Sequence, residues 1–486
     1  MERLCTSHVK VATVGSTVVT PLQSLGPNSA VPTPLKHLQS RFGIAELSGE
    51  LRLIDLQQMR NVMQGIARSE LAFYKRADGT IKMQRQLEVL PVKSDPKTEI
   101  SQFWKDPGTK IFDSVAFTPL PTSPSTINYW VPPTVNPTTG GSWQIIEAFL
   151  LDVICAGDRA LNDYLIHFIA HMLQHPEVKP GIIMVLLGGQ GTGKGTFFRI
   201  LHRIWSRTTL QVSDVNQIVG NFNAALERHY VICMDEALFS GDKKSIERLK
   251  SLITEPFLHV EQKYQPSRTI ESFHRFFATS NNEFFGQVDA DDRRFVFLRV
   301  SDSRQTDLAY FDAVHKAIDD DACMGAMVYD LLNLTLSGFN PRQRPKTPEH
   351  LSQRLQSLNG FDRFWYEKLC LGQLPKKHSN DWRGGFVATL EIQEGYRDFD
   401  PKSQHHRSLQ DDQIAAKLRK YCPSARKTRS NQQGVKQRGY ELPTLVVARQ
   451  EFTAHIGNTI DWDVSELTES PSSDQLALPG PSAVAQ

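Results

Sequence analysis

The sequence predicts an α/β fold organised around a parallel β-sheet. Short, uninterrupted apolar segments recur in the middle of the chain, at 182–187, 230–234, 276–280 and 295–300. Continuous apolar runs of this kind are typical of parallel strands that are buried on both faces. The first run is followed by a glycine-rich turn and then by an apolar helix over 197–204, and this strand–turn–helix order is a building unit of α/β folds.

The composition is that of an ordinary globular protein. The chain has 486 residues, of which 40% are hydrophobic and 22% charged, and its formal net charge is +2. At about 150 residues per domain, this length indicates about three domains. The six scattered cysteines argue against a disulfide framework and favour a reducing compartment. We see no signal peptide, and no apolar run approaches the roughly 20 residues that cross a bilayer, so we expect no membrane span.

Ahead of the sheet, we expect a loose lead over 1–40 that is rich in Ser, Thr and Pro, and a helix over 44–72. Repeated prolines predict that 73–140 are irregular. Two apolar stripes over 143–175, separated by Gly157 and Asp158, predict a helical hairpin. We therefore expect an N-terminal region of unknown role over 1–95, partly disordered, and a helical cap over 96–180.

After the sheet-bearing core, which we assign to 181–302, the pattern is helical over 303–372. A module over 373–462 contains a predicted helix at 408–421 and strand-like runs at 386–390 and 445–447. The tail over 463–486 is acidic, carries Ser and Pro, and contains no Lys or Arg, so we expect it to be disordered.

The glycine-rich turn has the composition of a phosphate-binding loop. Glycines permit positive φ and let backbone N–H groups approach phosphates, the next helix directs its positive end at them, and a lysine contacts the β and γ oxygens. The pattern matches G-x-x-x-x-G-K up to Lys194, but Gly195 stands where Ser or Thr is usual, so we assign the magnesium hydroxyl to Thr196. The predicted nucleotide-binding residues are Gly188, Gly189, Gln190, Gly191, Thr192, Gly193, Lys194, Gly195 and Thr196.

An acidic pair follows the second apolar run. Asp235 and Glu236 come directly after 231–234. A phosphate-loop enzyme needs one acid to hold magnesium through water, and a hydrolase needs a base to activate the attacking water. We assign the first role to Asp235 and the second to Glu236. A simple kinase has less use for the second acid, so the pair favours hydrolysis.

Two further polar groups follow the later strands. Asn281 ends the run at 276–280 and is predicted to orient the attacking water or contact the γ-phosphate, with Asn282 as its substitute. Arg293 and Arg294 precede the last run. In a ring-shaped ATPase, an arginine at this place can reach a neighbour's γ-phosphate and stabilise transition-state charge. The sequence does not decide which of the two arginines acts.

These elements, in this order, resemble the superfamily 3 helicases of the AAA+ class, and more narrowly the helicase part of phage and prophage primase–helicase (primase–polymerase) proteins. The matching segments are 128–130, 171–176, the phosphate loop, 220–223, 235–237, 249–255, 260–263, 280–282, 293–294, 339–341 and 345–348. The resemblance implies a P-loop AAA+ ATPase core with a parallel sheet, preceded by a helical cap and followed by helices and a winged-helix-like module.

The resemblance further implies a homo-hexameric ring that binds ATP and Mg2+ and moves on single-stranded DNA during replication. It implies a hairpin over 257–276 whose tip, with Lys263 and Arg268, contacts DNA in the ring channel. It also implies a place in the host cytoplasm and partners such as a primase or other replication proteins. The N-terminal region shows no clear acidic metal motif, so we do not expect primase activity from it.

The segment 401–440 is strongly basic. Ten Lys and Arg residues there face only Asp411 and Asp412 as acids. A helix, a basic loop and strands in this order are typical of a winged helix, whose cations neutralise DNA phosphates. The candidate DNA-binding residues of this module are Arg426, Lys427, Arg429, Lys436 and Arg438.

The sequence therefore predicts an ATP-dependent DNA helicase of a phage, prophage or mobile element. Two alternatives stay open. One is a P-loop nucleotide kinase, because G-K-G-T also opens kinase-like loops. The other is a DNA-binding replication initiator or loader whose ATPase acts as a switch.

Overall fold

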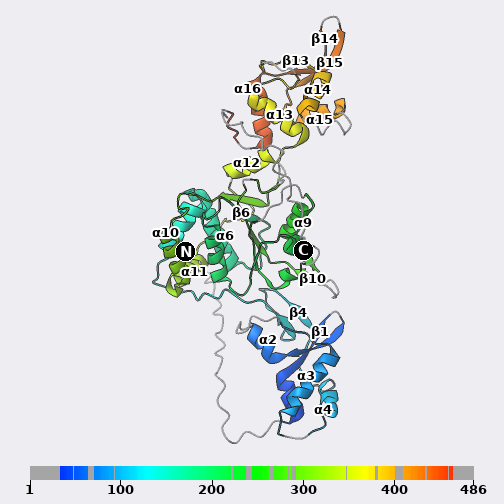
Figure 1. Cartoon of the computed structure of the whole chain (residues 1–486), viewed down its shortest axis with the longest axis vertical. Coiled ribbons are helices and arrows are strands. Elements are labelled where there is room, and N and C mark those ends of the chain that lie inside the picture. The colour runs from blue at the N-terminus through cyan, green and yellow to red at the C-terminus, as the bar shows by residue number, and fades with distance from the viewer. Residues whose placement is uncertain are drawn as a thin grey trace, which may run out of the picture. The chain divides into compact units, whose positions relative to one another are not determined.

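The computed structural model describes residues 33–47, 49–63, 71–91, 94–220, 223–236, 243–261, 268–282, 284–286, 292–345, 347–377, 381–399, 409–432, 435–457 and 459–462. The chain divides into two compact units (Figure 1). The first runs to Val115 and includes Pro124–Ile127, and the second comprises Ala116–Ser123 and the chain from Asn128 onward. The predicted disorder of the tail over 463–486 lies outside the described residues, as does most of the predicted lead.

The first unit packs helices against a small sheet. Its helices are α1 (Pro34–Arg41), α2 (Leu56–Met63), α3 (Arg76–Glu88) and α4 (Pro96–Phe103), and its strands β1 (Phe42–Leu47), β2 (Glu50–Asp55) and β3 (Ile111–Phe112) are ordered β2-β1-β3. The core gathers Leu38, Phe42, Leu53, Met83 and Phe103 from separate elements.

The helix predicted over 44–72 is wrong in its first part. Residues 42–55 form the antiparallel pair β1–β2 instead, and among the described residues of this range only α2 is helical. The turn between the strands contains Gly49 at φ 79°, a left-handed conformation that glycine adopts without strain. Leu51 of β2 is half exposed. The irregularity predicted over 73–140 also missed α3, and α4 belongs to this unit although we expected a boundary at residue 95.

The chain passes into the second unit through β4 (Ser114–Ala116) and β5 (Thr126–Asn128), which form a two-stranded sheet. The predicted helical hairpin follows. It consists of α5 (Gln144–Ala148), the π-helical segment η1 (Phe149–Ile154) and α6 (Arg159–Gln174), with the break at Gly157, where φ is 82°. Asp158 caps α6 by accepting a hydrogen bond from the backbone of Leu161.

The centre of the second unit is a parallel sheet, as predicted. Its strands are β6 (Ile183–Leu187), β7 (Thr209–Val212), β8 (Val231–Met234), β11 (Arg275–Ser280) and β12 (Phe295–Arg299). They are ordered β12-β6-β11-β8-β7, and every neighbouring pair is parallel. The four apolar runs are β6, β8, β11 and β12, and β7 at the edge was not predicted.

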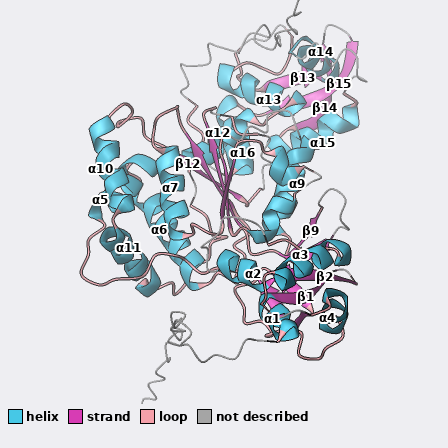
Figure 2. Cartoon of the chain, turned by 60° about the horizontal axis from the view of Figure 1, so that its bottom comes forward, coloured by secondary structure: helices cyan, strands magenta, loops and turns pink. Residues whose placement is uncertain are grey.

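Helices cover both faces of this sheet (Figure 2). One face packs on α9 (Lys243–Thr254) through residues such as Ile246, Leu249 and Ile253. The opposite face of the sheet packs on α6 and on α7 (Lys194–Ile204). There, Phe277 of β11 contacts Phe168 and Phe197. Burial on both sides explains why these strands read as continuous apolar runs.

Short elements complete this region. They are α8 (Asn216–Val219), the 3-10 helix η2 (Ala224–Arg228), and the strands β9 (Phe257–Val260) and β10 (Arg268–Glu271). The two strands pair antiparallel, as a hairpin over 257–276 requires. The predicted helical segment follows as α10 (Leu308–Asp319), α11 (Asp321–Asn333), α12 (Pro348–Gln356) and α13 (Gly360–Leu371).

The C-terminal part builds its own core. The strands β13 (Gly385–Ala388), β14 (Arg426–Gln432) and β15 (Val435–Leu442) form an antiparallel sheet ordered β13-β15-β14. The helices are α14 (Thr389–Phe399), α15 (Asp411–Tyr421) and α16 (Leu445–Ile456). The strand predicted at 445–447 is wrong, because these residues begin α16. The core also takes in Phe361 and Trp365 of α13, ahead of the boundary that we expected at residue 373.

Within the described residues, no helix is long and apolar enough to cross a membrane.

Candidate nucleotide site

The carboxyl ends of β6, β11 and β8 meet at one edge of the sheet, and a cavity of about 260 Å3 lies there. Ligands of open α/β sheets bind at this edge because loops and helix N-termini converge on it. Ten residues from four regions of the chain line the cavity: Gln190, Gly191, Gly193, Lys194, Gly195, Thr196, Asp235, Glu236, Asn281 and Phe311. The fold thus brings together the glycine-rich loop, the acidic pair and Asn281. Gly188, Gly189 and Thr192 belong to the same loop.

The loop between β6 and α7 depends on its glycines. Gly191 has φ 76° and Gly193 has φ 104°, both in the left-handed region. A Cβ at Gly193 would lie 3.0 Å from the ring of Phe311 and 3.1 Å from that of Phe149. Thr192 closes the loop by donating to the carbonyl of Gly189 at 2.9 Å. Gly193 is therefore required both by its backbone conformation and by its two aromatic neighbours.

Lys194 is buried against the loop. Its Nζ donates to the carbonyls of Gly188 and Gly189, each at 2.6 Å. Burial lowers the pKa of the Lys194 ammonium from its ordinary value, while the nearby carboxylates of Asp235 and Glu236 act to raise it. The side chain thus stands at the loop with carboxylates close by, as a cation that contacts phosphates would.

Thr279 organises the acidic pair. This fully buried residue of β11 donates through its hydroxyl to Oδ1 of Asp235 at 2.7 Å and accepts the backbone N–H of Glu236 at 3.0 Å. The other oxygen of Asp235 accepts from Nε2 of Gln211 at 3.2 Å. Asp235 is therefore oriented from β11 on one side and from β7 on the other.

Glu236 has a strained backbone. Its φ of 52° lies in the left-handed region, which non-glycine residues adopt at an energetic cost and which recurs at functional sites. The side chain reaches towards β11, where Nδ2 of Asn281 donates to its Oε1 at 3.1 Å. Glu236 and Asn281 thus form a direct pair at the cavity wall.

Thr196 lies in the first turn of α7, and its hydroxyl is 3.0 Å from Nε2 of His315 in α10. The hydroxyl and the Asp235 carboxylate both line the cavity. Oxygen donors of these types suit Mg2+, which keeps several waters and takes few protein ligands. Among the described residues, no cluster of three or more His, Cys, Asp or Glu forms a complete cage. Thr196 and Asp235 are thus residues of the cavity whose oxygens could hold such an ion.

The two candidate arginines lie outside the cavity of their own chain. Arg294 is half-buried and donates through Nη1 to Asp292 at 3.2 Å. Asp292 is buried and also lies 3.4 Å from Nζ of Lys250, which links α9 to this segment. Arg293, in contrast, is exposed at the surface.

The candidate DNA-contacting hairpin is anchored at its base. Lys179 donates to the carbonyls of Leu252 and Glu255 and to the hydroxyl of Ser272, which lie before β9 and after β10. In β10, the backbone of Arg268 pairs with Val260. Lys263 and the side chain of Arg268 lie outside the described part of the structure.

The basic residues of the C-terminal module divide between two faces of the β14–β15 hairpin. Alternation places Lys427, Arg429, Lys436 and Arg438 on one face, with Arg429 directly opposite Arg438. Arg426 points to the other face, opposite Glu441. Lys427 is partly neutralised by Asp411 at 2.6 Å. The first face is thus a concentration of exposed cations.

Sequence reasoning missed four residues of this site. Thr279, Gln211, Phe311 and His315 contact the predicted site residues from elements distant in the chain. A signal existed only for Thr279, which stands among the polar residues that end β11. The other three become visible only when β7 and α10 are placed beside the loop.

Comparisons with known proteins agree with the fold. Residues 186–294 match a family of unknown function, DUF5906. The chain is 26% identical over 156 residues to the DNA primase-polymerase of Nitratiruptor phage NrS-1. That alignment spans 31% of this chain and 21% of the phage protein, so the chain matches about a fifth of its relative's length.

Solved structures extend this similarity over most of the chain. The A form of the ligand-free NrS-1 C-terminal region has a TM-score of 0.58 at 14% identity, covering 83% of this chain and 97% of that one. A second ligand-free structure of that region has a TM-score of 0.56 at 14% identity, covering 84% and 99%. The chain therefore shares the fold of that region, and the predicted α/β fold with a parallel sheet is confirmed.

Proposed function

We propose that this chain is an ATP-dependent DNA helicase with a P-loop AAA+ core of the superfamily 3 type, which acts in the replication of a phage, prophage or mobile element. The observation that carries the proposal is the cavity at the sheet edge. It combines a glycine-rich loop with a lysine, an acidic pair and an asparagine, which are the groups that nucleoside triphosphate hydrolysis needs.

In this proposal the loop from Gly188 to Thr196 holds the phosphates of ATP. Lys194 leaves the carbonyls of Gly188 and Gly189 and contacts the phosphate oxygens. Asp235 and the hydroxyl of Thr196 hold Mg2+, which neutralises phosphate charge when it is bound. Because Thr279 and Gln211 already orient Asp235, this part of the site is preorganised.

Glu236 removes a proton from the attacking water, and Asn281 positions both the water and the Glu236 carboxylate. The hydrogen bond between Asn281 and Glu236 shows that Asn281 reaches the carboxylate. A simple kinase has less use for a second acid beside Asp235, so the presence of Glu236 at the cavity favours hydrolysis over a kinase.

The arginine acts between subunits of a homo-hexamer. Neither Arg293 nor Arg294 lines the cavity of its own chain, so a role in phosphate chemistry requires a neighbouring copy. Arg294 is engaged by Asp292, whereas Arg293 is exposed, and we therefore favour Arg293 as the residue that reaches the neighbour.

DNA is the partner we assign to the basic surfaces. The similarity to a phage DNA primase-polymerase supports a role in DNA replication. The β9–β10 hairpin, with Lys263 and Arg268, contacts single-stranded DNA, and the cations on the face of the β14–β15 hairpin that carries Arg429 and Arg438 neutralise phosphates.

ATP turnover measured with and without single-stranded DNA, beside light scattering after size exclusion, tests the proposal. We expect DNA-stimulated hydrolysis and an ATP-dependent ring. Phosphate transfer to a small acceptor without DNA would identify a kinase. ATP-dependent DNA binding without strand displacement at either polarity would identify a switch ATPase of the initiator or loader type.

A further inference from the structure

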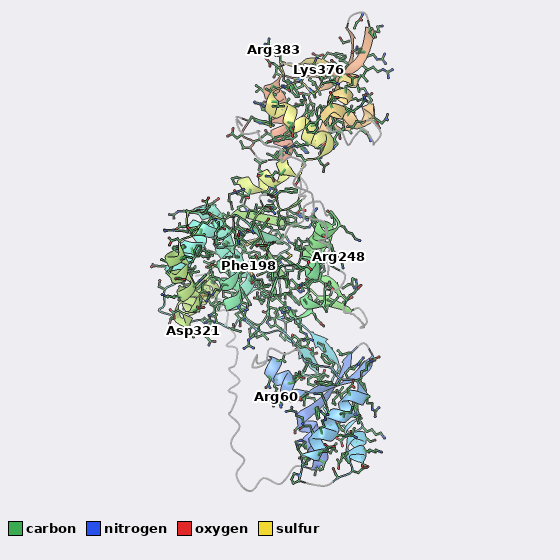
Figure 3. The ribbon with its side chains drawn as sticks, in the orientation of Figure 1. Arg60, Phe198, Arg248, Asp321, Lys376 and Arg383 are labelled. Atoms are coloured by element: carbon green, nitrogen blue, oxygen red, sulfur yellow. The ribbon has the colours of Figure 1, made fainter. Side chains whose placement is uncertain are left out.

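Helix α10 lies along α7, the helix that follows the glycine-rich loop. Phe311 contacts the loop at Gly193, His315 reaches Thr196, and Asp319 pairs with Arg199 at 2.6 Å. These contacts follow the same order along both helices, so the helices run in the same direction. Asp321, which begins α11 and is labelled in Figure 3, pairs with Arg203 of α7, whereas Phe198 on α7 is buried inside the unit.

The contact between Thr196 and His315 differs from the others because it reaches the cavity. Thr196 is 8% exposed and lines the cavity, and its hydroxyl forms a hydrogen bond with Nε2 of His315 at 3.0 Å. The position after Lys194, where a hydroxyl is usual, is Gly195, and a Cβ there would meet nothing within 4 Å. The space beside Gly195 is therefore open, and the next hydroxyl along the chain is that of Thr196.

We propose that His315 is a positioning residue that orients the Thr196 hydroxyl towards the metal of the bound nucleotide. This inference rests on the proposed function. A hydroxyl that binds Mg2+ through its oxygen must donate its proton elsewhere, and a neutral Nε2 accepts it. With the proton directed to His315, the oxygen lone pairs face the cavity. His315 thus compensates for the missing hydroxyl at Gly195 by fixing the rotamer of the next one.

The partners of metal ligands affect affinity even though they do not touch the metal, and their loss typically weakens metal binding by about 10- to 100-fold. In His315→Ala, the Thr196 hydroxyl loses its acceptor and can rotate. We therefore expect the Mg2+ concentration needed for tight nucleotide binding to rise about 10-fold. Nucleotide binding in EDTA, which does not depend on the hydroxyl, is expected to stay the same.

The experiment titrates the 486-residue chain with a fluorescent ATP analogue at a series of Mg2+ concentrations and in EDTA. His315→Gln, which retains an acceptor, is expected to recover part of the Mg2+ affinity. Asp319→Ala is the matched control, because it removes the Arg199 contact of the same helix pair and leaves the hydroxyl alone. Its Mg2+ dependence is expected to equal that of the parent protein.

A double-mutant cycle separates this role from simple loss of structure. In a Thr196→Val background, His315→Ala is expected to add no further effect, because the hydroxyl that it positions is gone. Gly195→Ser, for which the structure has room, is expected to restore Mg2+ affinity in His315→Ala. Equal losses in His315→Ala and Asp319→Ala would overturn the inference in favour of a packing role.

The failures of the two proposals are distinguishable. If the parent protein binds no nucleotide with Mg2+, the proposed function fails, and this inference fails with it. If Thr196→Val weakens Mg2+-dependent binding but His315→Ala does not, the proposed function survives and only the inference about His315 is overturned.

Discussion

Asn281 donates a hydrogen bond from Nδ2 to Oε1 of Glu236 across a distance of 3.1 Å. The two residues follow different strands, β11 and β8, which are direct neighbours in the sheet. Because β11 also neighbours β6, the asparagine stands between the glycine-rich loop and the carboxylate. Glu236 adopts φ 52° at this point, and Thr279 holds its backbone N–H. The sheet order therefore assembles the pair on which the proposed hydrolysis depends.

Replacing Glu236 with Gln tests the proposed base. The amide keeps the size of the side chain but cannot take a proton, so ATP binding is expected to persist while turnover falls by about 10²- to 10⁴-fold. Nucleotide affinity and steady-state hydrolysis, measured on the same preparation, check both parts. Hydrolysis near that of the parent protein would refute the assignment of Glu236.

Replacing Asn281 with Ala tests its pairing with the carboxylate. We expect turnover to fall by about 10- to 100-fold, since a contributing hydrogen-bond donor at a reacting centre is worth a few kcal/mol. Asn282→Ala is the matched control because Asn282 is the adjacent asparagine and does not line the cavity. If Asn282→Ala were the more damaging change, the roles of the two asparagines would be reversed.

The glycines of the loop are expected to differ in tolerance. Gly193→Ala places a Cβ at φ 104° and against two aromatic rings, which costs about 1–3 kcal/mol and should weaken nucleotide binding by 10-fold or more. Gly195→Ala meets open space and is expected to bind nucleotide almost normally. Comparing the affinities of the two variants checks the loop geometry, and equal losses would contradict it.

The protein is expected to lose stability in acid because of buried histidines. His274 is 1% exposed, accepts from Ser272 and donates to the carbonyl of Leu226, and burial lowers its pKa to about 3. In the unfolded chain the imidazole of His274 protonates near pH 6.5. The contribution of the neutral, buried imidazole to the free energy of unfolding is therefore complete above that pH and is lost as the pH falls towards 3. The slope is at most about 1.4 kcal/mol per pH unit for one group.

Denaturant unfolding between pH 7 and pH 4.5 measures this slope. Burial also lowers the pKa of His171 and of His350 to about 4, so both add to the acid sensitivity. His274→Gln is expected to be less stable at pH 7 but to show a shallower pH dependence. The control His202→Gln, at an exposed position of α7, should leave the slope unchanged, and an unaltered slope in His274→Gln would contradict the prediction.

The two faces of the β14–β15 hairpin are expected to differ in DNA binding. Arg438→Ala removes a cation from the face that also carries Arg429, so DNA affinity should fall. The slope of log affinity against log salt concentration should decrease by about the amount that one phosphate contact contributes. Stability should not fall, because like charges directly opposite each other are unfavourable. Arg426→Ala, on the other face, is the control, and titrations at several salt concentrations compare the two variants.

The parallel strands of the second unit could be predicted because a strand buried on both faces needs apolar residues at successive positions. Such strands therefore appear in the sequence as uninterrupted apolar runs. The same reasoning failed where an apolar residue is not buried. Leu51 on β2 and Val446 on α16 are both exposed, and each belongs to a segment whose type was predicted wrongly. In these segments the surrounding unit, and not the local pattern, decides which residues are covered.

The amino-acid sequence by itself determined the glycine-rich loop, the acidic pair and Asn281, because each follows a strand directly and carries a recognisable chemistry. Only the tertiary structure decided how they are oriented. Thr279 bridges Asp235 and Glu236, and His315 meets Thr196 from a helix that is far away in the chain. Such contacts depend on the order of strands in the sheet and on the packing of α10 against α7. Neither of these produces a pattern among neighbouring residues of the sequence.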